Sequence, residues 1–272
     1  MITRKYHGLG NDYLVLEDAG GVALNPERVV RICDRHTGIG SDGILEPVAA
    51  DGGADFGLRI WNPDGTTAEK SGNGIRIFAR WLVDHRGAAL LHTLSLPGCT
   101  VACEVGPNEI TVQMGQATFV PAEIPCTEAL LDTAIEVTGD TLRATAVGLG
   151  NPHCVVRCRE DLDHLPWRRW GAALEVSDRF PNRTNCQFVR PMSRSKIEAR
   201  VWERGAGETQ ASGSSACAVA AAMVRLGHME RSVEVVMQGG SLRVEVGEEW
   251  ALTLSGPVAE VGRVEVAAAL LG

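Results

Sequence analysis

The feature that most constrains this chain is a pair of similar segments that begin 141 positions apart. The tetrapeptide SGNG at residues 71–74 precedes an apolar run, and SGSS at residues 212–215 precedes a second apolar run. Each run ends in a glycine, as helix C-termini often do. We interpret the two segments as copies of one supersecondary unit, which predicts two similar domains.

The rest of the chain predicts an α+β fold. Helical periodicity is clear at residues 25–35, 75–84 and 216–226. The last of these is apolar on nearly every side, so we expect it to be buried all round, as it would be inside a curled sheet. Short strand-like runs, several of which alternate apolar and polar residues, are typical of mostly antiparallel sheets. These runs are residues 13–18, 56–61, 100–105, 109–114, 153–158, 186–191, 196–202, 233–237, 241–246 and 250–256.

The length of 272 residues suits two domains of about 130 residues each. We place the first domain at residues 1–117 and the second at residues 118–259. The C-terminal segment 260–272 is expected to return to the first domain.

Composition narrows the class of partner. The formal charge is −8 and the basic residues are scattered, so we expect no nucleic-acid partner. No apolar stretch reaches the roughly 18 residues of a membrane span, and the first residues contain no secretory apolar region, so we expect a cytoplasmic protein without a membrane partner. A homodimer is the default oligomer.

Metal and cofactor sites are not expected either. The eight cysteines form no C-x-x-C pair, and we interpret most of them as small buried apolar residues. The seven histidines form no H-x-x-x-H pair. No stretch is typical of a nucleotide loop or a pyridoxal-phosphate site, so we expect no cofactor.

The two serines at the helix entrances have two interpretations. A serine in this position is ordinarily an N-cap, whose oxygen accepts a bond from a backbone N–H group. The neighbouring glycines also leave the first-turn N–H groups accessible, and such helix ends attract carboxylates. Two such entrances that face each other would make a site for an anionic substrate with a hydroxyl on either side.

Polar residues at the ends of predicted strands fit an amino-acid ligand. Arginine and asparagine bind carboxylates, and glutamate binds an ammonium group. Individually these residues are also ordinary turn residues or surface pairs. They are Asn11, Asn62, Asn151, His153, Asn185, Glu203 and Arg204.

Six motifs in order give the chain a resemblance to a known family. They are HGLGNDY, CDRHTGIGSDG, WNPDGTTAEKSGNGIRIFAR, GLGNPHCVV, RTNCQFV and VWERGAGETQASGSSACA. Together they resemble the diaminopimelate epimerases, which are cofactor-independent amino-acid epimerases, over nearly the whole chain. The resemblance implies two similar domains, each a barrel-like curled sheet around a central helix, with the active site in the cleft between them.

The resemblance also implies a reaction and a set of residues. The reaction is interconversion of LL- and meso-diaminopimelate, a step of lysine and peptidoglycan precursor synthesis, by two opposed groups that remove and deliver a proton at the α-carbon. The implied catalytic residues are Ser71 and Ser212. The implied substrate-binding residues are Asn11, Asn62, Gly72, Asn73, Asn151, Asn185, Glu203, Arg204, Gly213 and Ser214.

The chain departs from the family at both catalytic positions, where members of the usual kind carry cysteine. A thiol has an unperturbed pKa of about 8.5, and the pKa of a serine hydroxyl lies several units higher. A serine that acts as a base therefore needs help from a neighbour. His153 and Glu208 are the candidates, although each also fits a structural role, His153 in a turn and Glu208 beside the helix entrance.

Three explanations of the paired serines remain open. The chain is an epimerase that uses serine as acid and assisted base; or it runs a neighbouring reaction, such as an isomerisation, a dehydration or the racemisation of another amino acid; or the serines were engineered to make a ligand trap. A weakly active amino-acid-binding homologue is the alternative from outside the enzymes.

Overall fold

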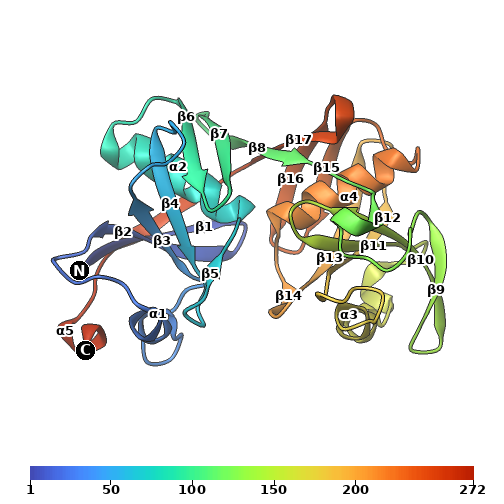
Figure 1. The fold of residues 1–272 in the computed structure, drawn as a ribbon, viewed down its shortest axis with the longest axis horizontal. Coiled ribbons are helices and arrows are strands. Elements are labelled where there is room, and N and C mark those ends of the chain that lie inside the picture. The colour runs from blue at the N-terminus through green and yellow to red at the C-terminus, as the bar shows by residue number, and fades with distance from the viewer. The chain divides into compact units, whose positions relative to one another are not determined.

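The computed structural model describes all residues from Met1 to Gly272 and divides them into two compact units. The first unit is Met1–Val112 together with Gly256–Gly272, and the second is Gln113–Ser255 (Figure 1). No helix is both long enough and apolar enough to cross a bilayer.

The first unit is a curled sheet with three helices. Its strand order is β18-β1-β2-β3-β4-β6-β7-β8, in which β2–β3 and β4–β6 are parallel and the other pairs antiparallel. The short strand β5 pairs with β4. The strands are β1 (Ile2–Gly8), β2 (Asn11–Asp18), β3 (Ile44–Val48), β4 (Phe56–Trp61), β5 (Thr67–Ala68), β6 (Leu91–Leu96), β7 (Cys99–Val105), β8 (Ile110–Gln116) and β18 (Ala259–Glu265). The helices are α1 (Pro26–Cys33), α2 (Gly72–Arg86) and α5 (Ala268–Leu271).

The second unit repeats this plan. Its strand order is β9-β10-β11-β12-β13-β15-β16-β17, with β11–β12 and β13–β15 parallel and the short strand β14 paired with β13. The strands are β9 (Thr133–Val137), β10 (Asp140–Gly148), β11 (Pro152–Arg157), β12 (Asn185–Pro191), β13 (Lys196–Glu203), β14 (Gly207–Thr209), β15 (Ser232–Met237), β16 (Gly240–Val246) and β17 (Ala251–Gly256). The helices are α3 (Trp167–Glu175) and α4 (Gly213–Arg225), with single 3₁₀ turns at Pro121–Glu123, Leu162–His164 and Glu248–Trp250.

The same alternation of antiparallel and parallel pairs therefore occurs twice. In both units the long helix follows the short strand, as α2 follows β5 and α4 follows β14. This repeat confirms the predicted α+β fold of two similar domains.

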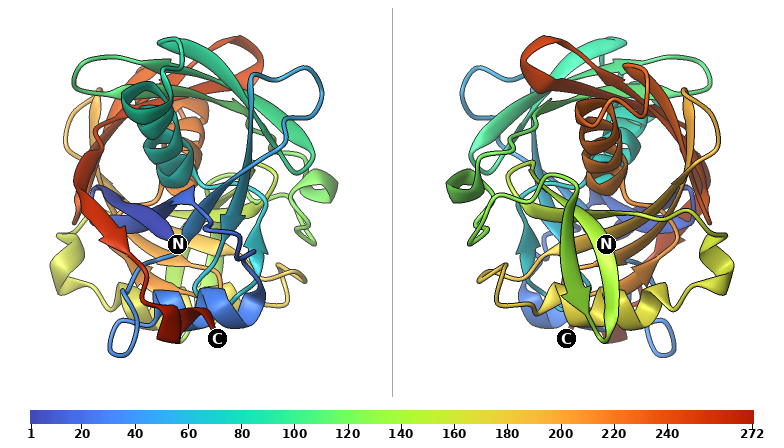
Figure 2. Two further views of the ribbon diagram at one scale, coloured as in Figure 1. Left: turned by 90° about the vertical axis from the view of Figure 1, so that its left-hand side faces the viewer. Right: turned by 90° about the vertical axis from the view of Figure 1, so that its right-hand side faces the viewer.

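A central helix lies inside each curled sheet, as both views of Figure 2 show. Helix α4 contacts β10, β11, β12, β15 and β16, and every residue from 216 to 223 is 0 % exposed. Its run of alanines lets the surrounding strands approach closely, which explains how a helix can be enclosed by one sheet. Helix α2 is buried over most of its length and ends at Arg86, followed by Gly87, whose φ of 67° suits a glycine C-cap.

One of the three peripheral helices was predicted from the sequence. Helix α1 begins after an Asn25 N-cap and lies within the predicted range 25–35. Helix α3, which the sequence analysis missed, packs Trp167 and Trp170 against Phe188 of β12. The C-terminal α5, also missed, contacts α1.

The cysteines are all free thiols. Only Cys99 is exposed, and the other seven are buried, as the sequence analysis predicted for most of them. Burial raises the pKa of Cys103 and of Cys154 to about 12, so these thiols stay protonated and serve as packing residues.

Candidate functional site

Ser71 is the N-cap of α2. Its backbone is extended, with φ −138° and ψ 115°, and its Oγ accepts a hydrogen bond of 3.0 Å from the N–H group of Gly74. The hydroxyl of Tyr13, on β2, lies 3.2 Å from the same Oγ. Ser71 is therefore a cap, and a second hydroxyl lies against its oxygen.

A chain of hydrogen bonds joins the first turn of α2 to the end of the β1–β2 hairpin. Asn73 Nδ2 donates to Asn11 Oδ1 at 3.0 Å, and Asn11 Nδ2 donates to Asp42 Oδ2 at 2.7 Å. Arg35 forms an ion pair of 2.7 Å with the other oxygen of Asp42. The structure thus brings two of the predicted binding residues, Asn11 and Asn73, together beside Ser71.

A buried cation lies one turn into the same helix. Arg76 is 0 % exposed, and its guanidinium donates to Gly72 O at 3.1 Å and to Asn73 Oδ1 at 2.8 Å. Gly72 is buried at the first position of α2. The positive charge of Arg76 adds to the positive end of the helix dipole, so this end of α2 favours negative charge on a neighbouring group.

Ser212 occupies the equivalent position at the start of α4. Its φ of −141° and ψ of 124° nearly repeat those of Ser71, but its side chain makes no cap hydrogen bond. Its hydroxyl instead donates to Glu203 Oε2 at 3.2 Å. Ser212 is only 5 % exposed, and β13 ends at Glu203.

The residues that follow Ser212 form the first turn of α4. Gly213 is buried and Ser214 is partly exposed. Their N–H groups belong to the unpaired donors of a helix N-terminus, which bind carboxylates well.

His153 is buried within a side-chain network of the second unit. Its Nδ1 lies 3.0 Å from Gln187 Nε2, and its Nε2 lies 2.9 Å from Asn151 Oδ1. Gln187 Nε2 also donates to Ser215 Oγ at 3.0 Å. Because an amide nitrogen only donates, Nδ1 must accept, and the ring is the neutral tautomer that donates from Nε2.

Burial and a nearby cation keep that ring neutral. His153 is 0 % exposed, and its burial, with a smaller contribution from the charge of Arg204, lowers its pKa to about 3. Its hydrogen bonds go to Asn151 and Gln187 rather than to a serine of the predicted pair. The geometry gives His153 the task of orienting the Asn151 carboxamide.

Asn185 connects two chain segments of this region. Its Nδ2 donates to Pro152 O at 3.1 Å, and its Oδ1 accepts the N–H group of Arg204 at 3.0 Å. These bonds fix the backbone of Arg204 beside the start of β11. The Arg204 guanidinium itself is exposed and donates to Asn182 O at 3.3 Å.

Two predicted residues have partners away from the serines. Asn62 lies in the turn after β4, where its Nδ2 donates to Thr66 Oγ1 at 2.9 Å. Glu208 forms a bidentate pair with Arg168 at 2.6 and 2.8 Å, and this hydrogen bonding lowers its pKa. The carboxylate that meets Ser212 belongs to Glu203 and not to Glu208.

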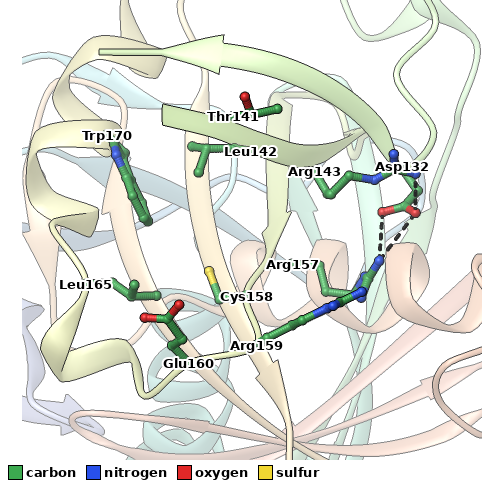
Figure 3. A pocket seen from close by; sticks show the side chains of 10 residues that line it. All are labelled: Asp132, Thr141, Leu142, Arg143, Arg157, Cys158, Arg159, Glu160, Leu165 and Trp170. Atoms are coloured by element: carbon green, nitrogen blue, oxygen red, sulfur yellow. Dashed lines mark hydrogen bonds and ion pairs between the residues drawn. The ribbon is translucent and has the colours of Figure 1, made fainter. Parts of the chain in front are cut away.

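The pocket in Figure 3, of about 490 Å³, contains none of the predicted site residues. It lies in the second unit between β10, the end of β11 and α3. Asp132 forms ion pairs there with Arg143 at 2.6 Å and with Arg157 at 3.3 Å. Arg159 and Glu160 also line the pocket, so its three arginines and two carboxylates give it a net formal charge of +1. No cluster of three or more histidine, cysteine or acidic side chains converges on a metal position.

Sequence reasoning missed two residues that contact the predicted site. Tyr13 is the last residue of the HGLGNDY motif, yet it was assigned only to a strand. Gln187 is fully buried in the strand run CQFVRP, where a polar residue among apolar ones was the available signal. Both are side chains whose partners come from distant parts of the chain.

Solved structures of similar fold include amino-acid racemases and epimerases. A probable proline racemase from Agrobacterium radiobacter matches with a TM-score of 0.73 and 14 % identity over 98 % of this chain and 93 % of its own. A hydroxyproline epimerase from Agrobacterium vitis matches with a TM-score of 0.71 and 16 % identity over 98 % of this chain and 90 % of its own. The chain thus has the two-domain fold of these proteins.

The sequence comparisons identify the family. The model of the diaminopimelate epimerase family matches residues 3–120 and 145–260. Diaminopimelate epimerase of Synechococcus elongatus is 37 % identical over 97 % of this chain and 98 % of its own length. Diaminopimelate epimerase 1 of a Nostoc species is 38 % identical over 94 % of this chain and 96 % of its own. The chain belongs to the diaminopimelate epimerase family.

Proposed function

We propose that this protein is a cofactor-independent amino-acid epimerase that interconverts LL- and meso-diaminopimelate. The relatives named diaminopimelate epimerase span almost the whole chain, which supports this substrate. The observation that carries the mechanism is the repeat: each unit presents one serine, in nearly the same backbone conformation, at the N-cap of its central helix.

In this mechanism Ser71 and Ser212 stand where family members of the usual kind carry cysteine. Inversion needs two groups that reach one α-carbon from opposite faces. One removes the proton, and the other delivers a proton to the second face. A hydroxyl can deliver a proton, although it is a weaker acid than a thiol, and it needs assistance to remove one.

Glu203 supplies that assistance to Ser212. Because a carboxylate only accepts, the Ser212 proton points toward Glu203 and the lone pairs of Ser212 Oγ remain available. As the Cα–H bond breaks, a new O–H bond forms at Ser212 and the original Ser212 proton moves to Glu203. No free alkoxide has to form, and positioned proton transfer of this kind contributes on the order of 10² to 10⁴ in rate.

The remaining groups bind the amino acid. The first-turn N–H groups of α2 and α4 suit the α-carboxylate, where negative charge also develops as the proton leaves. Asn151, Asn185 and Arg204 suit the distal carboxylate, and Glu203 suits an ammonium group. Asn11 and Asn73 complete the binding side chains beside Ser71, and Asn62 is assigned to the same role.

The test is to follow LL-diaminopimelate in D₂O by NMR and chiral chromatography, with a panel of other amino acids alongside. We expect deuterium at Cα together with inversion, and loss of inversion in Ser71→Ala and in Ser212→Ala. Exchange without inversion would instead identify a one-base reaction. Inversion of only another amino acid would change the substrate assignment.

Calorimetry separates the remaining alternative. Tight binding of diaminopimelate with neither exchange nor turnover would identify a binding homologue. A cytoplasmic location and a homodimer remain predictions from the sequence, and light scattering on the purified protein tests the second.

A further inference from the structure

The hydroxyl of Tyr13 lies 3.2 Å from Ser71 Oγ, and no such group lies against Ser212. Tyr13 is 7 % exposed and lies on β2 directly across from Tyr6 of β1. Its ring packs against the backbone of Gly43, where an added Cβ would come within 2.9 Å of Tyr13 Cε1. The phenol is therefore held in place beside the serine.

The hydrogen-bond capacity of Ser71 determines the direction of its proton. A hydroxyl carries one proton and two lone pairs. The Gly74 N–H group donates to one lone pair of Ser71 Oγ. A phenol is a stronger acid than an alkyl alcohol, so Tyr13 is the better donor of the pair. When Tyr13 donates, both lone pairs of Ser71 are occupied, and the Ser71 proton is left to point at a third partner.

We propose that Tyr13 is a positioning residue that donates to Ser71 and thereby makes Ser71 the proton-delivering member of the serine pair. This inference rests on the proposed function and adds a direction to it. Ser212, whose proton is directed to Glu203, is the proton-removing member. The two serines are thus prepared for opposite tasks before substrate arrives.

The delivering step balances without any further reactant. The Ser71 O–H bond breaks as the new Cα–H bond forms, and the electron pair of the carbanion becomes that bond. The Tyr13 proton moves to Ser71 Oγ in the same step, so the negative charge ends on a phenolate and not on an alkoxide. In the reverse reaction the phenolate takes back the Ser71 proton while Ser71 removes the proton from Cα.

The kinetic test is Tyr13→Phe in two backgrounds. With Ser71 present, we expect kcat for inversion to fall on the order of 10- to 100-fold with KM within about twofold. In a Ser71→Cys background the same change should cost less than about threefold, because a thiolate carries the charge itself. Equal losses in both backgrounds would indicate a merely structural role and overturn the proposal.

Tyr6→Phe is the matched control. Tyr6 is the only other tyrosine, and its hydroxyl bonds to Glu260 at 3.0 Å instead of to a serine. Its loss should leave the kcat for inversion within about twofold. An equal fall in Tyr6→Phe would assign the effect to the hairpin and overturn the proposal.

A second test does not depend on turnover. The alkylation rate at position 71 of the Ser71→Cys variant, followed against pH by mass spectrometry, reports the pKa of that thiol. A donated hydrogen bond stabilises the thiolate, so adding Tyr13→Phe should raise the thiol pKa by about half a unit to one unit. An unchanged or lowered pKa would overturn donation by Tyr13. If the wild-type protein inverted no amino acid, the proposed function would fail while this measurement still decided the role of Tyr13.

Discussion

Asn151 and His153, two residues apart at the start of β11, are joined by a hydrogen bond of 2.9 Å between Oδ1 and Nε2. Gln187 fixes the opposite side of the imidazole, so the ring acts as a rigid neutral link. A buried histidine of this kind does not serve as a proton acceptor at neutral pH. It holds a carboxamide at a fixed angle, and its own charge state becomes a determinant of stability.

The first prediction concerns stability at low pH. The pKa of His153 is about 3 in the folded protein, against about 6.5 in the unfolded chain. Below pH 6.5 the unfolded chain therefore binds the extra proton, and the free energy of unfolding falls by up to about 1.4 kcal/mol per pH unit toward pH 3. Urea unfolding should show a shallower pH dependence over this range in His153→Gln than in the wild type. His36→Gln, at an exposed histidine, is the control, and equal slopes in all three proteins would contradict the prediction.

The second prediction concerns the carboxylate beside Ser212. Glu203→Gln retains a hydrogen-bond acceptor for Ser212 but cannot take up its proton. We expect the rate of Cα–H exchange to fall by at least about 10²-fold, since assisted proton removal is lost. Glu234→Gln, which removes an exposed carboxylate paired with Lys196, is the control and should leave the rate unchanged. Full activity in Glu203→Gln would remove this residue from the proton pathway.

The third prediction uses two glycines of the same helix. A Cβ at Gly74 would lie 3.3 Å from Ser71 Oγ and 3.1 Å from Leu45 Cδ2, so Gly74→Ala should displace the serine. Alanine stabilises a helix by about 1 kcal/mol relative to glycine, and this gain offsets the cost of the crowding. We therefore expect Tm to stay nearly unchanged while kcat falls about tenfold. Gly87→Ala should do the reverse. The φ of 67° at Gly87 strains alanine, and Gly87 lies at the end of α2 away from Ser71. We expect it to cost about 1 kcal/mol of stability with kcat unchanged. Matching effects of the two substitutions on both quantities would show that crowding at Ser71 is not what limits activity.

The fourth prediction tests Glu208 as a helper. Both of its carboxylate oxygens are bonded to Arg168, whose side chain is 57 % exposed. Glu208→Gln should therefore leave kcat within about twofold and lower stability by less than about 1 kcal/mol, as for other exposed ion pairs. Arg168→Gln should match it in thermal unfolding. A large loss of kcat in Glu208→Gln alone would restore the helper role.

The regular parts of the fold were predictable because they follow local patterns. All the strand runs identified from alternation coincide with strands, from β2 to β17, and the three periodic segments coincide with helices α1, α2 and α4. The sequence analysis missed eight strands, which are β1, β3, β5, β6, β9, β10, β14 and β18, and four of these carry weak local signals. Strand β1 places Arg4 and Lys5 directly before Tyr6, β3 contains Pro47, and β5 and β14 are only two and three residues long. Helix α3 has two arginines among its tryptophans and depends on packing against β12 for its stability.

The candidate site was likewise predictable only in part from the sequence. The serines, the glycines after them and the nearby asparagines stood out because residue type and position relative to a helix or strand end carry the signal. The hydrogen-bond partners of these residues could not be predicted from the sequence, because they depend on register across the sheet. The contact of Tyr13 with Ser71 depends on the position of β2 beside its helix. The hydrogen bond from Ser212 to Glu203, rather than to Glu208, depends in the same way on the position of β13. Side-chain orientation of this kind is fixed by tertiary packing and has no local sequence signature.

The enclosure of α4 has a consequence for the order in which the second unit opens. Residues 216 to 223 of α4 are wholly buried. Their amide protons can exchange with solvent only when the surrounding sheet separates. The amides of α4 should accordingly be among the slowest in the chain to exchange for deuterium. Ser212 is the N-cap residue of α4, which we expect to open late, and so Ser212 keeps its orientation while loops and chain ends fray.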